Sequence, residues 1–444
     1  MGEESTIYAP ATAPGRSGLA VIRLSGPAAA ESLERLTGRA LPKPRCMLRR
    51  SISDPVTADL LDEGMVAWFP APASFTGETV VELYLHGGRA VLAAVLAALS
   101  KLPNLKLAEP GEFTRRAFLN GCLDLTEVEG LADLVAAETE AQRRQALRQL
   151  EGALGQLYRG WSESLTAALA RIEAAIDFPE EDLPASLIVS VAEQALPVAE
   201  AIARHLADGH RGERLRDGFS VAILGPPNAG KSSLFNSLAK REAAIVSPQE
   251  GTTRDVLEIA LDLGGYPVLL ADTAGLRRTR NEIEAEGVRR AERRAADADL
   301  RIFVLDAERA EAQLSSILNL KKDQDLVLAN KLDLLAGRPL PALGVEILPI
   351  SVHSGAGLNE LARQIGEKAA RAIDSGGSPV LTRARHRAAL EEALGALRRG
   401  ADALGPELLA EDLRLAVRAL GRITGRVDVE DVLDRIFSEF CIGK

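Results

Sequence analysis

The sequence predicts a multidomain chain: an N-terminal α+β domain, an all-α helical domain in two parts, and an α/β domain inserted between those parts. Its 444 residues are too many for one ordinary domain. Residues 1–118 mix short strand-like runs with Gly and Pro, and residues 213–373 alternate apolar runs with polar loops. The stretches that flank this central region carry apolar residues at helical spacing.

The N-terminal region, residues 1–118, is predicted to be an α+β domain. Leu19–Leu24 and Val80–Leu85 are short apolar runs typical of strands. Gly26–Thr37 and Ala90–Ser100 have the spacing of amphipathic helices.

Helices are predicted on both sides of the central region, over residues 119–212 and 374–444. Thr126-Glu-Val-Glu129 resembles a capping box at a helix start, and Leu187–His210 continues the helical pattern after an interruption at Pro179. Beyond a Ser-Gly-Gly-Ser linker, Thr382 to Leu404 and the segment up to Phe440 are again helical in pattern. An inserted α/β domain accounts for this order, and two separate helical domains would give the same pattern.

The first motif of the central region is a phosphate-binding loop, Gly225-Pro-Pro-Asn-Ala-Gly-Lys-Ser232. It follows the predicted strand Phe219–Leu224 and precedes a helix, so its N–H groups and the helix start would face phosphates. Lys231 would reach the β- and γ-phosphates, and the Ser232 hydroxyl would bind Mg²⁺. The predicted contacts of this loop are Asn228, Ala229, Gly230, Lys231, Ser232 and Ser233.

Two further segments predict that the base is guanine. Asn330-Lys-Leu-Asp333 ends the predicted strand Leu326–Ala329, and Asp333 would accept hydrogen bonds from guanine N1–H and its exocyclic amine. Ser351-Val-His-Ser-Gly355 follows the apolar run Val345–Ile350 and would contact the same base through its backbone. The predicted base contacts are Asn330, Lys331, Asp333, Ser351, Val352 and His353.

Between these motifs lie the expected γ-phosphate and Mg²⁺ contacts. Asp272-Thr-Ala-Gly275 ends the predicted strand Pro267–Ala271; Asp272 would hold the Mg²⁺ water shell and Gly275 would bond the γ-phosphate through its N–H. Thr253 would complete the Mg²⁺ coordination. Turn-rich loops would have a similar composition. Four motifs in this order predict a Ras-like P-loop GTPase domain that binds GTP and GDP, with Thr273 and Ala274 also near the nucleotide.

Another residue must position the water, because Leu276 stands where Ras-like enzymes have a glutamine. Another positive charge is also needed, because the motifs supply no obvious arginine finger. Glu282, Glu284 or Glu286 could orient the water, or the three could be the solvated acidic start of a helix. Asn228 could bind a monovalent cation near the phosphates, or it could be a turn residue after Pro227.

Composition limits the remaining classes. No apolar stretch approaches the roughly 18 residues of a membrane span, and the polar start is no signal peptide, which predicts a cytoplasmic protein. Three distant cysteines predict neither a disulfide framework nor a zinc site. A net charge of −10 argues against non-specific coating of nucleic acid. One arginine-rich run is either a local basic patch or a solvated helix face: Arg383, Arg385, Arg387, Arg398 and Arg399.

Four segments resemble the MnmE (TrmE) family of tRNA-modification GTPases: Thr6–Gly26, Phe75 to Gly88, Pro110–Asn120 and the terminal Phe440-Cys-Ile-Gly-Lys444. The resemblance covers essentially the whole chain. It implies a homodimer formed through N-terminal domains that bind a tetrahydrofolate one-carbon donor, such as 5,10-methylenetetrahydrofolate, with 5-formyltetrahydrofolate as an analogue. It also implies a heterotetramer-type complex with the FAD-dependent MnmG that adds a carboxymethylaminomethyl-type group to the wobble uridine of certain tRNAs.

The resemblance also assigns roles to individual residues. It implies potassium-dependent hydrolysis with Asn228, Ser247, Gln249 and Thr252 as K⁺ ligands. It selects Glu284 as the water-orienting residue, ordered when G domains dimerise. Together with Thr253 and Gly275, which the motifs indicate, Glu284 completes the predicted catalytic contacts.

A folate pocket is implied at Arg23, Glu82 and Lys444, although Arg23 and Glu82 could instead be a strand surface pair. Cys122 stands where relatives commonly have a lysine, which removes a charge from this pocket. Cys441 could act in or near the folate and uridine site, or it could be a small apolar residue of the helical domain.

A ribosome-assembly GTPase switch of the Era or Der kind is the alternative, since it shares the phosphate loop and the feature at Leu276. The terminal Cys-Ile-Gly-Lys and the N-terminal α+β domain discriminate between the two, because such a switch needs neither.

Overall fold

The computed structural model describes residues 5–177, 186–241, 244–245, 257–272, 297–318, 320–336, 338–341, 344–374, 376–403, 405–427, 430–438, 440 and 443. The chain forms two compact units. Met1–Ala132, Leu150–Ser162 and Leu420–Lys444 make up the first unit, and Asp133–Gln149 with Glu163–Ala419 make up the second. Among the residues described, no helix has the length and apolar character that a membrane span requires.

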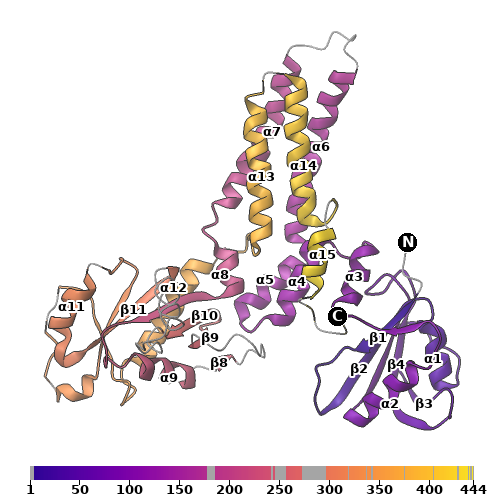
Figure 1. Ribbon diagram of the computed structural model, residues 1–444, viewed down its shortest axis with the longest axis horizontal. Helices are drawn as coiled ribbons and strands as arrows, with labels where there is room; N and C mark the ends of the chain where they lie inside the picture. The colour runs from indigo at the N-terminus through magenta and orange to yellow at the C-terminus, as the bar shows by residue number, and fades with distance from the viewer. Residues whose placement is uncertain are drawn as a thin grey trace, which may run out of the picture. The chain divides into compact units, whose positions relative to one another are not determined.

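The first unit contains a mixed sheet with the strand order β3-β4-β5-β2-β1-β6 (Figure 1). Its strands are β1 Thr6–Pro10, β2 Ser17–Ser25, β3 Leu48–Ser53, β4 Leu60–Phe69, β5 Val80–Gly87 and β6 Leu105–Leu107. Helices α1 (Ala29–Thr37) and α2 (Arg89–Leu99) pack on one face, where their apolar side chains join the buried residues Ile22, Leu24 and Leu83. Since side chains alternate along a strand, Arg23 and Glu82 lie on the opposite face.

The C-terminal part of this unit is helical. It contains α3 (Glu112–Leu119), the start of α4 (Leu125–Ala136) and α15 (Glu430–Ser438), which share an apolar cluster around Leu125, Phe437 and Phe440. Phe118 and Phe437 lie 6.4 Å apart between ring centroids. This cluster holds the end of the chain close to α3.

Helix α4 begins earlier than its predicted capping box. Asp124 is the capping residue: its carboxylate accepts from the backbone N–H groups of Thr126 and Glu127, and the Glu127 side chain accepts from the Asp124 N–H. The box is therefore Asp124-Leu-Thr-Glu127, and the prediction of Thr126 and Glu129 was wrong. Thr126 and Glu129 are both buried and both lie within α4, so Thr126 is not the residue that caps the helix.

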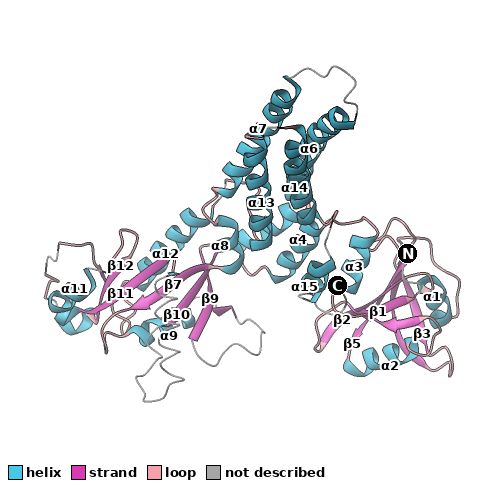
Figure 2. Cartoon of the chain, turned by 45° about the horizontal axis from the view of Figure 1, so that its top comes forward, coloured by secondary structure: helices cyan, strands magenta, loops and turns pink. Residues whose placement is uncertain are grey.

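The second unit contains the α/β sheet, with the strand order β13-β12-β11-β7-β10-β9-β8 (Figure 2). Its strands are β7 Phe219–Leu224, β8 Ala244–Ile245, β9 Leu257–Leu263, β10 Tyr266–Asp272, β11 Leu300–Asp306, β12 Leu326–Asn330 and β13 Leu348–Pro349. Strands β7, β10, β11, β12 and β13 are mutually parallel, and β9 runs antiparallel to β10.

Both faces of this sheet are covered. Ile302 and Val304 pack with α9 (Lys231–Arg241) and α12 (Leu358–Ile373), whereas the alternate residues Phe303 and Leu305 pack with α11 (Ala310–Leu318). Burial of both faces explains why β7, β11 and β12 are nearly continuous apolar runs in the sequence. The predicted Ras-like α/β domain is confirmed.

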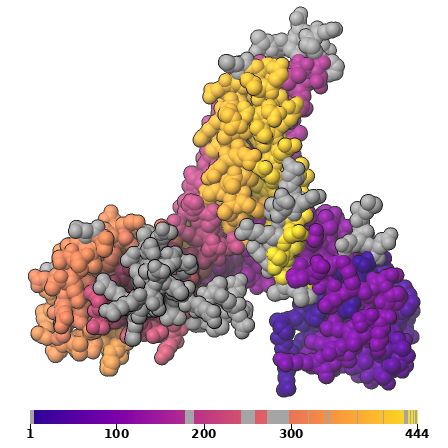
Figure 3. Space-filling view, in the orientation of Figure 1, coloured from indigo at the N-terminus to yellow at the C-terminus, as the bar shows by residue number. Residues whose placement is uncertain are grey.

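Helices lie on either side of the α/β domain in the sequence. They are α5 (Glu140–Leu150), α6 (Ala153–Asp177), α7 (Ser186–Leu206), α13 (Ala384–Ala401) and α14 (Pro406–Thr424). Helix α7 packs against α13 (Figure 1), and the residues after the α/β domain are coloured orange to yellow in Figure 3. Ala195 and Ala199 of α7 line one small cavity together with Leu397 of α13 and Leu409 of α14. Helices from before and after the α/β domain thus pack against each other in the second unit, as the insertion of that domain into a helical domain predicts.

The chain enters and leaves the inserted domain at neighbouring points. Helix α8 (Arg211–Asp217) begins the approach to the sheet, and a Cβ atom added at Gly212 would lie 2.2 Å from the Leu381 carbonyl oxygen. Arg387 of α13 contacts the segment that leads into the inserted domain, because it pairs with Glu213 at 3.0 Å and with Asp208 at 2.9 Å.

These contacts correct the interpretation of the arginine-rich run. Arg383 is 8% exposed and pairs with Asp133 at 2.7 Å, and Arg387 is held by Asp208 and Glu213. Arg399 pairs with Asp412 at 2.8 Å. Arg383 and Arg387 are enclosed and paired with acidic residues, which does not fit a basic patch. Arg398 and Arg399 are exposed, as a solvated helix face predicts.

Candidate functional site

The phosphate-binding loop begins where β7 ends and wraps tightly against its neighbours. Gly225 has φ 142°, and a Cβ atom there would lie 2.2 Å from the Val304 carbonyl oxygen. At Gly230 a Cβ atom would lie 2.2 Å from the Asn330 side-chain nitrogen. Glycine is therefore required at both positions.

Lys231 folds back over this loop. Its ammonium group donates to the carbonyl oxygens of Gly225 and Pro226, both at 2.8 Å. Helix α9 starts at the same residue, with Ser232 and Ser233 in its first turn and no acidic side chain there. A lysine charge, a helix N-terminus and tightly curled backbone together fit a polyphosphate.

Asn330 connects the phosphate loop to the predicted base-binding loop. Its side chain is 2% exposed and donates to the Ala229 carbonyl at 2.9 Å, and its amide oxygen accepts from the Val352 N–H at 3.1 Å. Both bonds cross between elements that are far apart in the sequence. The amide therefore fixes the separation of the two halves of the site.

Asp333 and Ser351 meet at the other end of the site. The Ser351 hydroxyl donates to the Asp333 carboxylate, and this bond holds the pKa of Asp333 below its ordinary value. Lys331 has φ 69° and pairs with Asp306 at 2.7 Å, which orients the short segment between Asn330 and Asp333. The Asp333 carboxylate is thus charged at neutral pH and can accept hydrogen bonds.

The parallel strands bring these motifs to one edge of the sheet. The phosphate loop follows β7, Asp272 ends β10, Asn330 ends β12 and Ser351 follows β13. Their carboxyl ends lie together because the strands are parallel. The remaining predicted contacts lie outside the described residues: Ser247, Gln249, Thr252, Thr253, Thr273, Ala274, Gly275 and Glu284, together with the side chain of Asp272.

A second polar site lies on the first unit. Arg23 and Glu82 are directly opposite in the β2–β5 register and form an ion pair of 2.9 Å. The Tyr84 hydroxyl donates to Glu82, and burial, followed by that carboxylate, raises the pKa of Tyr84 to about 12. The Arg23 guanidinium lies 5.4 Å from the Phe75 ring centroid and 5.9 Å from that of Phe113.

Arg23 and Glu82 therefore form the cross-strand pair that was the alternative to a folate contact, but the pair is enclosed and not on an open surface. Arg23 and Glu82 have side-chain exposures of 21% and 14%. Sequence reasoning did not identify Tyr84, Phe75 or Phe113, although Phe75 and Phe113 stand in the Gly-containing segments that carry the family resemblance.

The chain end and Cys122 lie near the same part of the sheet. A Cβ atom at Gly443 would lie 2.0 Å from the Pro10 carbonyl oxygen, and Ala9 of the same strand pairs with Arg23. Cys122 is exposed, and its sulfur would lie 3.0 Å from a Cβ atom at Gly77. The side chains of Cys441 and Lys444 lie outside the described residues.

Two models of known protein families match this chain. A model described as GTP-binding protein TrmE N-terminus matches residues 6–122, and a model described as MnmE helical domain matches residues 125–441, more than half of the chain. The chain belongs to the MnmE family. This confirms the resemblance seen in the sequence, and relatives that match over the whole chain leave no reason to prefer the Era or Der alternative.

MnmE relatives are similar over their full length. The tRNA modification GTPase MnmE of Rhodospirillum rubrum is 55% identical over 452 residues, covering 99% of both chains. That of Parvibaculum lavamentivorans is 57% identical over 446 residues, covering 99% of this chain and 100% of the relative. Among solved structures, Aquifex aeolicus Era bound to GDP and AlF4⁻ is 26% identical with a TM-score of 0.28, covering 40% of this chain and 66% of that one.

Proposed function

We propose that the chain binds and hydrolyses GTP as the GTPase of a tRNA-modifying assembly. The observation that carries this proposal is Asn330, which ties the phosphate loop to the loop of Ser351 and Val352. Asp333 stands beside Ser351, where a carboxylate can accept from the two donors of a guanine edge. Sites that use hydrogen bonds in this way discriminate by about 10⁴ or more.

The experiment that tests guanine selectivity is calorimetry of the purified full chain with GDP and ADP. We expect tight binding of GDP and at least a thousandfold weaker binding of ADP, the order of discrimination that paired hydrogen bonds give. Equal affinities would overturn the proposal, because they would remove the role of Asp333.

Hydrolysis would proceed by positioning and charge stabilisation. Lys231 and the loop N–H groups bind the phosphates, while Ser232 and Thr253 would hold Mg²⁺, with Asp272 on its water shell. Mg²⁺ supplies charge neutralisation at the phosphate oxygens. The Gly275 N–H would bond the γ-phosphate. Asn228, Ser247, Gln249 and Thr252 would hold K⁺, in a position that an arginine occupies in other GTPases.

Glu284 would orient the attacking water, since Leu276 cannot. Replacing Glu284 with Ala should lower turnover while leaving the affinity for GDP nearly unchanged, as expected for a contact made in the transition state. Glu282→Ala and Glu286→Ala are the matched controls, because both glutamates lie in the same acidic stretch. Equal effects of the three substitutions on turnover would argue against a specific role for Glu284.

We also propose that the first unit binds a tetrahydrofolate one-carbon donor. The enclosed Arg23–Glu82 pair and the approach of Gly443 to Pro10 support a site that includes Lys444 and, in its neighbourhood, Cys122 and Cys441. An arginine and a carboxylate side by side suit a pterin ring, and a lysine suits a glutamate tail. Binding of 5-formyltetrahydrofolate by the full chain, measured by calorimetry, tests this site.

Membership of the MnmE family supports a further proposal about the partners of this chain. We propose a homodimer that joins MnmG and adds a carboxymethylaminomethyl-type group at C5 of a wobble uridine. Mass analysis of nucleosides from tRNA treated with the reconstituted complex tests the product. Unmodified tRNA from a complex that still hydrolyses GTP would overturn this part of the proposal alone.

A further inference from the structure

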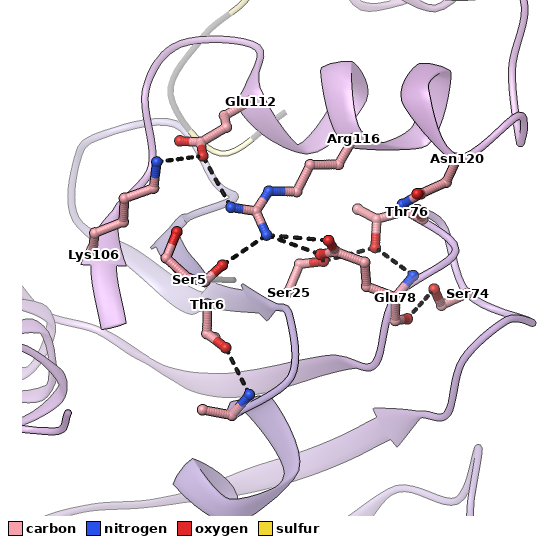
Figure 4. A network of polar contacts seen from close by, with 11 residues as sticks. Ser5, Thr6, Ser25, Ser74, Thr76, Glu78, Lys106, Glu112, Arg116 and Asn120 are labelled. Carbon is pink, nitrogen blue, oxygen red and sulfur yellow. Dashed lines mark hydrogen bonds and ion pairs between the residues drawn. The ribbon is translucent and has the colours of Figure 1, made fainter. Parts of the chain in front are cut away.

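We propose that Arg116 is a positioning residue for Arg23, because it fastens helix α3 to the loop that carries Phe75. The inference rests on the proposed folate site, and it adds a residue that does not itself touch the ligand. Arg116 and Arg23 belong to the same unit of the chain. Arg116 belongs to a buried polar network, which Figure 4 shows.

Arg116 is the centre of this network. Its side chain is 5% exposed, and its guanidinium pairs with Glu78 at 3.0 Å and with Glu112 at 3.1 Å. It also donates to the Ser5 carbonyl at 2.9 Å. Figure 4 shows the guanidinium pointing from α3 toward the loop that contains Glu78.

The loop is held on both sides of Phe75. The Ser25 hydroxyl lies 2.7 Å from both the Glu78 carboxylate and the Thr76 hydroxyl, and Asn120 donates to the Thr76 carbonyl at 2.7 Å. The Ser74 hydroxyl donates to the Glu78 carbonyl. Phe75, whose ring contacts Arg23, thus lies between residues that are fixed by hydrogen bonds.

Helix α3 supplies the opposite half of the arrangement. Phe113 and Arg116 lie three residues apart on α3, and Asn120 follows the last residue of the helix, four residues after Arg116, so the spacing places the three on one side. One of them contacts Arg23, and the other two hold the loop. The Arg116–Glu78 pair therefore determines how far apart the two rings stand, and both ring centroids lie within 6 Å of the Arg23 guanidinium.

The geometry of an arginine is needed here. A guanidinium can donate in a plane to two carboxylates and a carbonyl at once, whereas an ammonium group is a single point charge on a flexible stem. With little water able to enter, the contacts that a lysine leaves unmade would not be replaced. We therefore expect the loop to lose its fixed position when only the shape of the cation changes.

The test is calorimetry of the full chain with 5-formyltetrahydrofolate and, separately, with GDP. Arg116→Lys should weaken folate binding about tenfold, by analogy with the lower range seen when the residues that support metal-ligating side chains are replaced, and should leave GDP affinity unchanged. Glu78→Gln keeps the acceptor for Ser25 but weakens the bond to Arg116, and should act in the same direction. Arg115→Lys is the matched control, because Arg115 is a half-exposed neighbour on α3 whose 3.6 Å contact to Asp434 is loose.

A second comparison separates positioning from general destabilisation. In an Arg23→Lys background, adding Arg116→Lys should change folate affinity little further, because the group being positioned is already gone. Independent, additive losses would overturn the inference, as would unchanged binding by Arg116→Lys or Glu78→Gln. Failure of the unsubstituted chain to bind folate would instead overturn the folate site, and this inference with it.

Discussion

At the scale of a single residue, the side-chain amide of Asn330 connects the two halves of the nucleotide site. It bonds Ala229 in the phosphate loop and Val352 in the base loop. The motif spacing predicted that Asn330 lies in the site, but the pattern gives no sign of its bridging role. That role depends on the packing of β7, β12 and β13, which sequence spacing does not specify.

Asp333 should determine which base is bound. Guanine presents N–H donors to its carboxylate, whereas xanthine replaces the exocyclic amine with a carbonyl that needs a donor. Asp333→Asn should therefore weaken GDP binding by a factor on the order of a thousand and favour the xanthine nucleotide. Calorimetry with both nucleotides measures this change. Asp323→Asn, on an exposed turn before β12, should alter neither affinity.

Asn228 should make hydrolysis depend on the monovalent ion. It has φ 63° at the turn of the phosphate loop, and a cation bound by its carbonyl would stabilise charge that develops on the phosphates. The GTPase rate should rise severalfold when K⁺ replaces Na⁺, and Asn228→Ala should abolish this response. Asn236→Ala, exposed on α9, is the control. A rate that is the same in both ions would contradict the cation site.

Local signals predicted the secondary-structure elements well and their ends less well. The run Phe219–Leu224 predicted β7 correctly, but β13 is only Leu348–Pro349 within the apolar run Val345–Ile350. Strand length depends on pairing with β12, which a run of apolar residues does not specify. At α4, several residues could serve as the cap, and only the fold shows that Thr126 is buried.

The cap of α4 should contribute measurably to the stability of the first unit. The Asp124 carboxylate accepts from two backbone N–H groups and pairs with Arg159 at 2.6 Å. Asp124→Ala should lower the free energy of unfolding by about 1 to 3 kcal/mol, since it removes a helix cap and leaves an arginine without its partner. Urea unfolding followed by circular dichroism measures the loss. Glu163→Ala, exposed within α6, should shift the midpoint far less.

The end of α7 should make the second unit sensitive to acid. Burial, the largest cause, lowers the pKa of His205 to about 4 from its ordinary 6.5, with Asp208 opposing and His386 and Arg387 adding to the shift. The unfolded chain therefore binds a proton that the folded chain does not between these pH values, so stability falls as pH drops through this range. The loss between pH 7 and pH 5 should reach about 2 kcal/mol.

Urea unfolding at the two pH values tests this effect. His205→Gln should be less sensitive to the same change in pH, because the substituted side chain does not titrate. An equal pH response in both proteins would assign the acid sensitivity to other groups.

The architecture of the whole molecule was predictable in outline. Motif order indicated the central Ras-like domain, and apolar periodicity indicated helices on both sides. The pairing of α7 with α13 was not predictable, because periodicity shows which face of a helix is buried but not which partner covers it. Likewise, the Arg23–Glu82 register and the rings of Phe75 and Phe113 depend on contacts between distant segments.

The proposed dimer should become more compact when the transition state of hydrolysis is mimicked. We expect the G domains of two chains to meet only when the nucleotide, Mg²⁺ and K⁺ sites are all filled, since we propose that this meeting orders Glu284. Small-angle X-ray scattering should give a smaller radius of gyration with GDP, aluminium fluoride and K⁺ than with GDP alone. Na⁺ in place of K⁺ should prevent the change. A radius that does not respond to K⁺ would contradict ion-dependent closure.

The closeness of Gly212 to Leu381 has an architectural consequence. Since the polypeptide leaves the helical domain and returns to it at adjoining points, a few linking residues could bypass the entire intervening segment. The two helical stretches would then stay joined in their native order. The GTPase is, in this sense, a removable cassette, and the same geometry offers a route by which such a cassette could have been acquired.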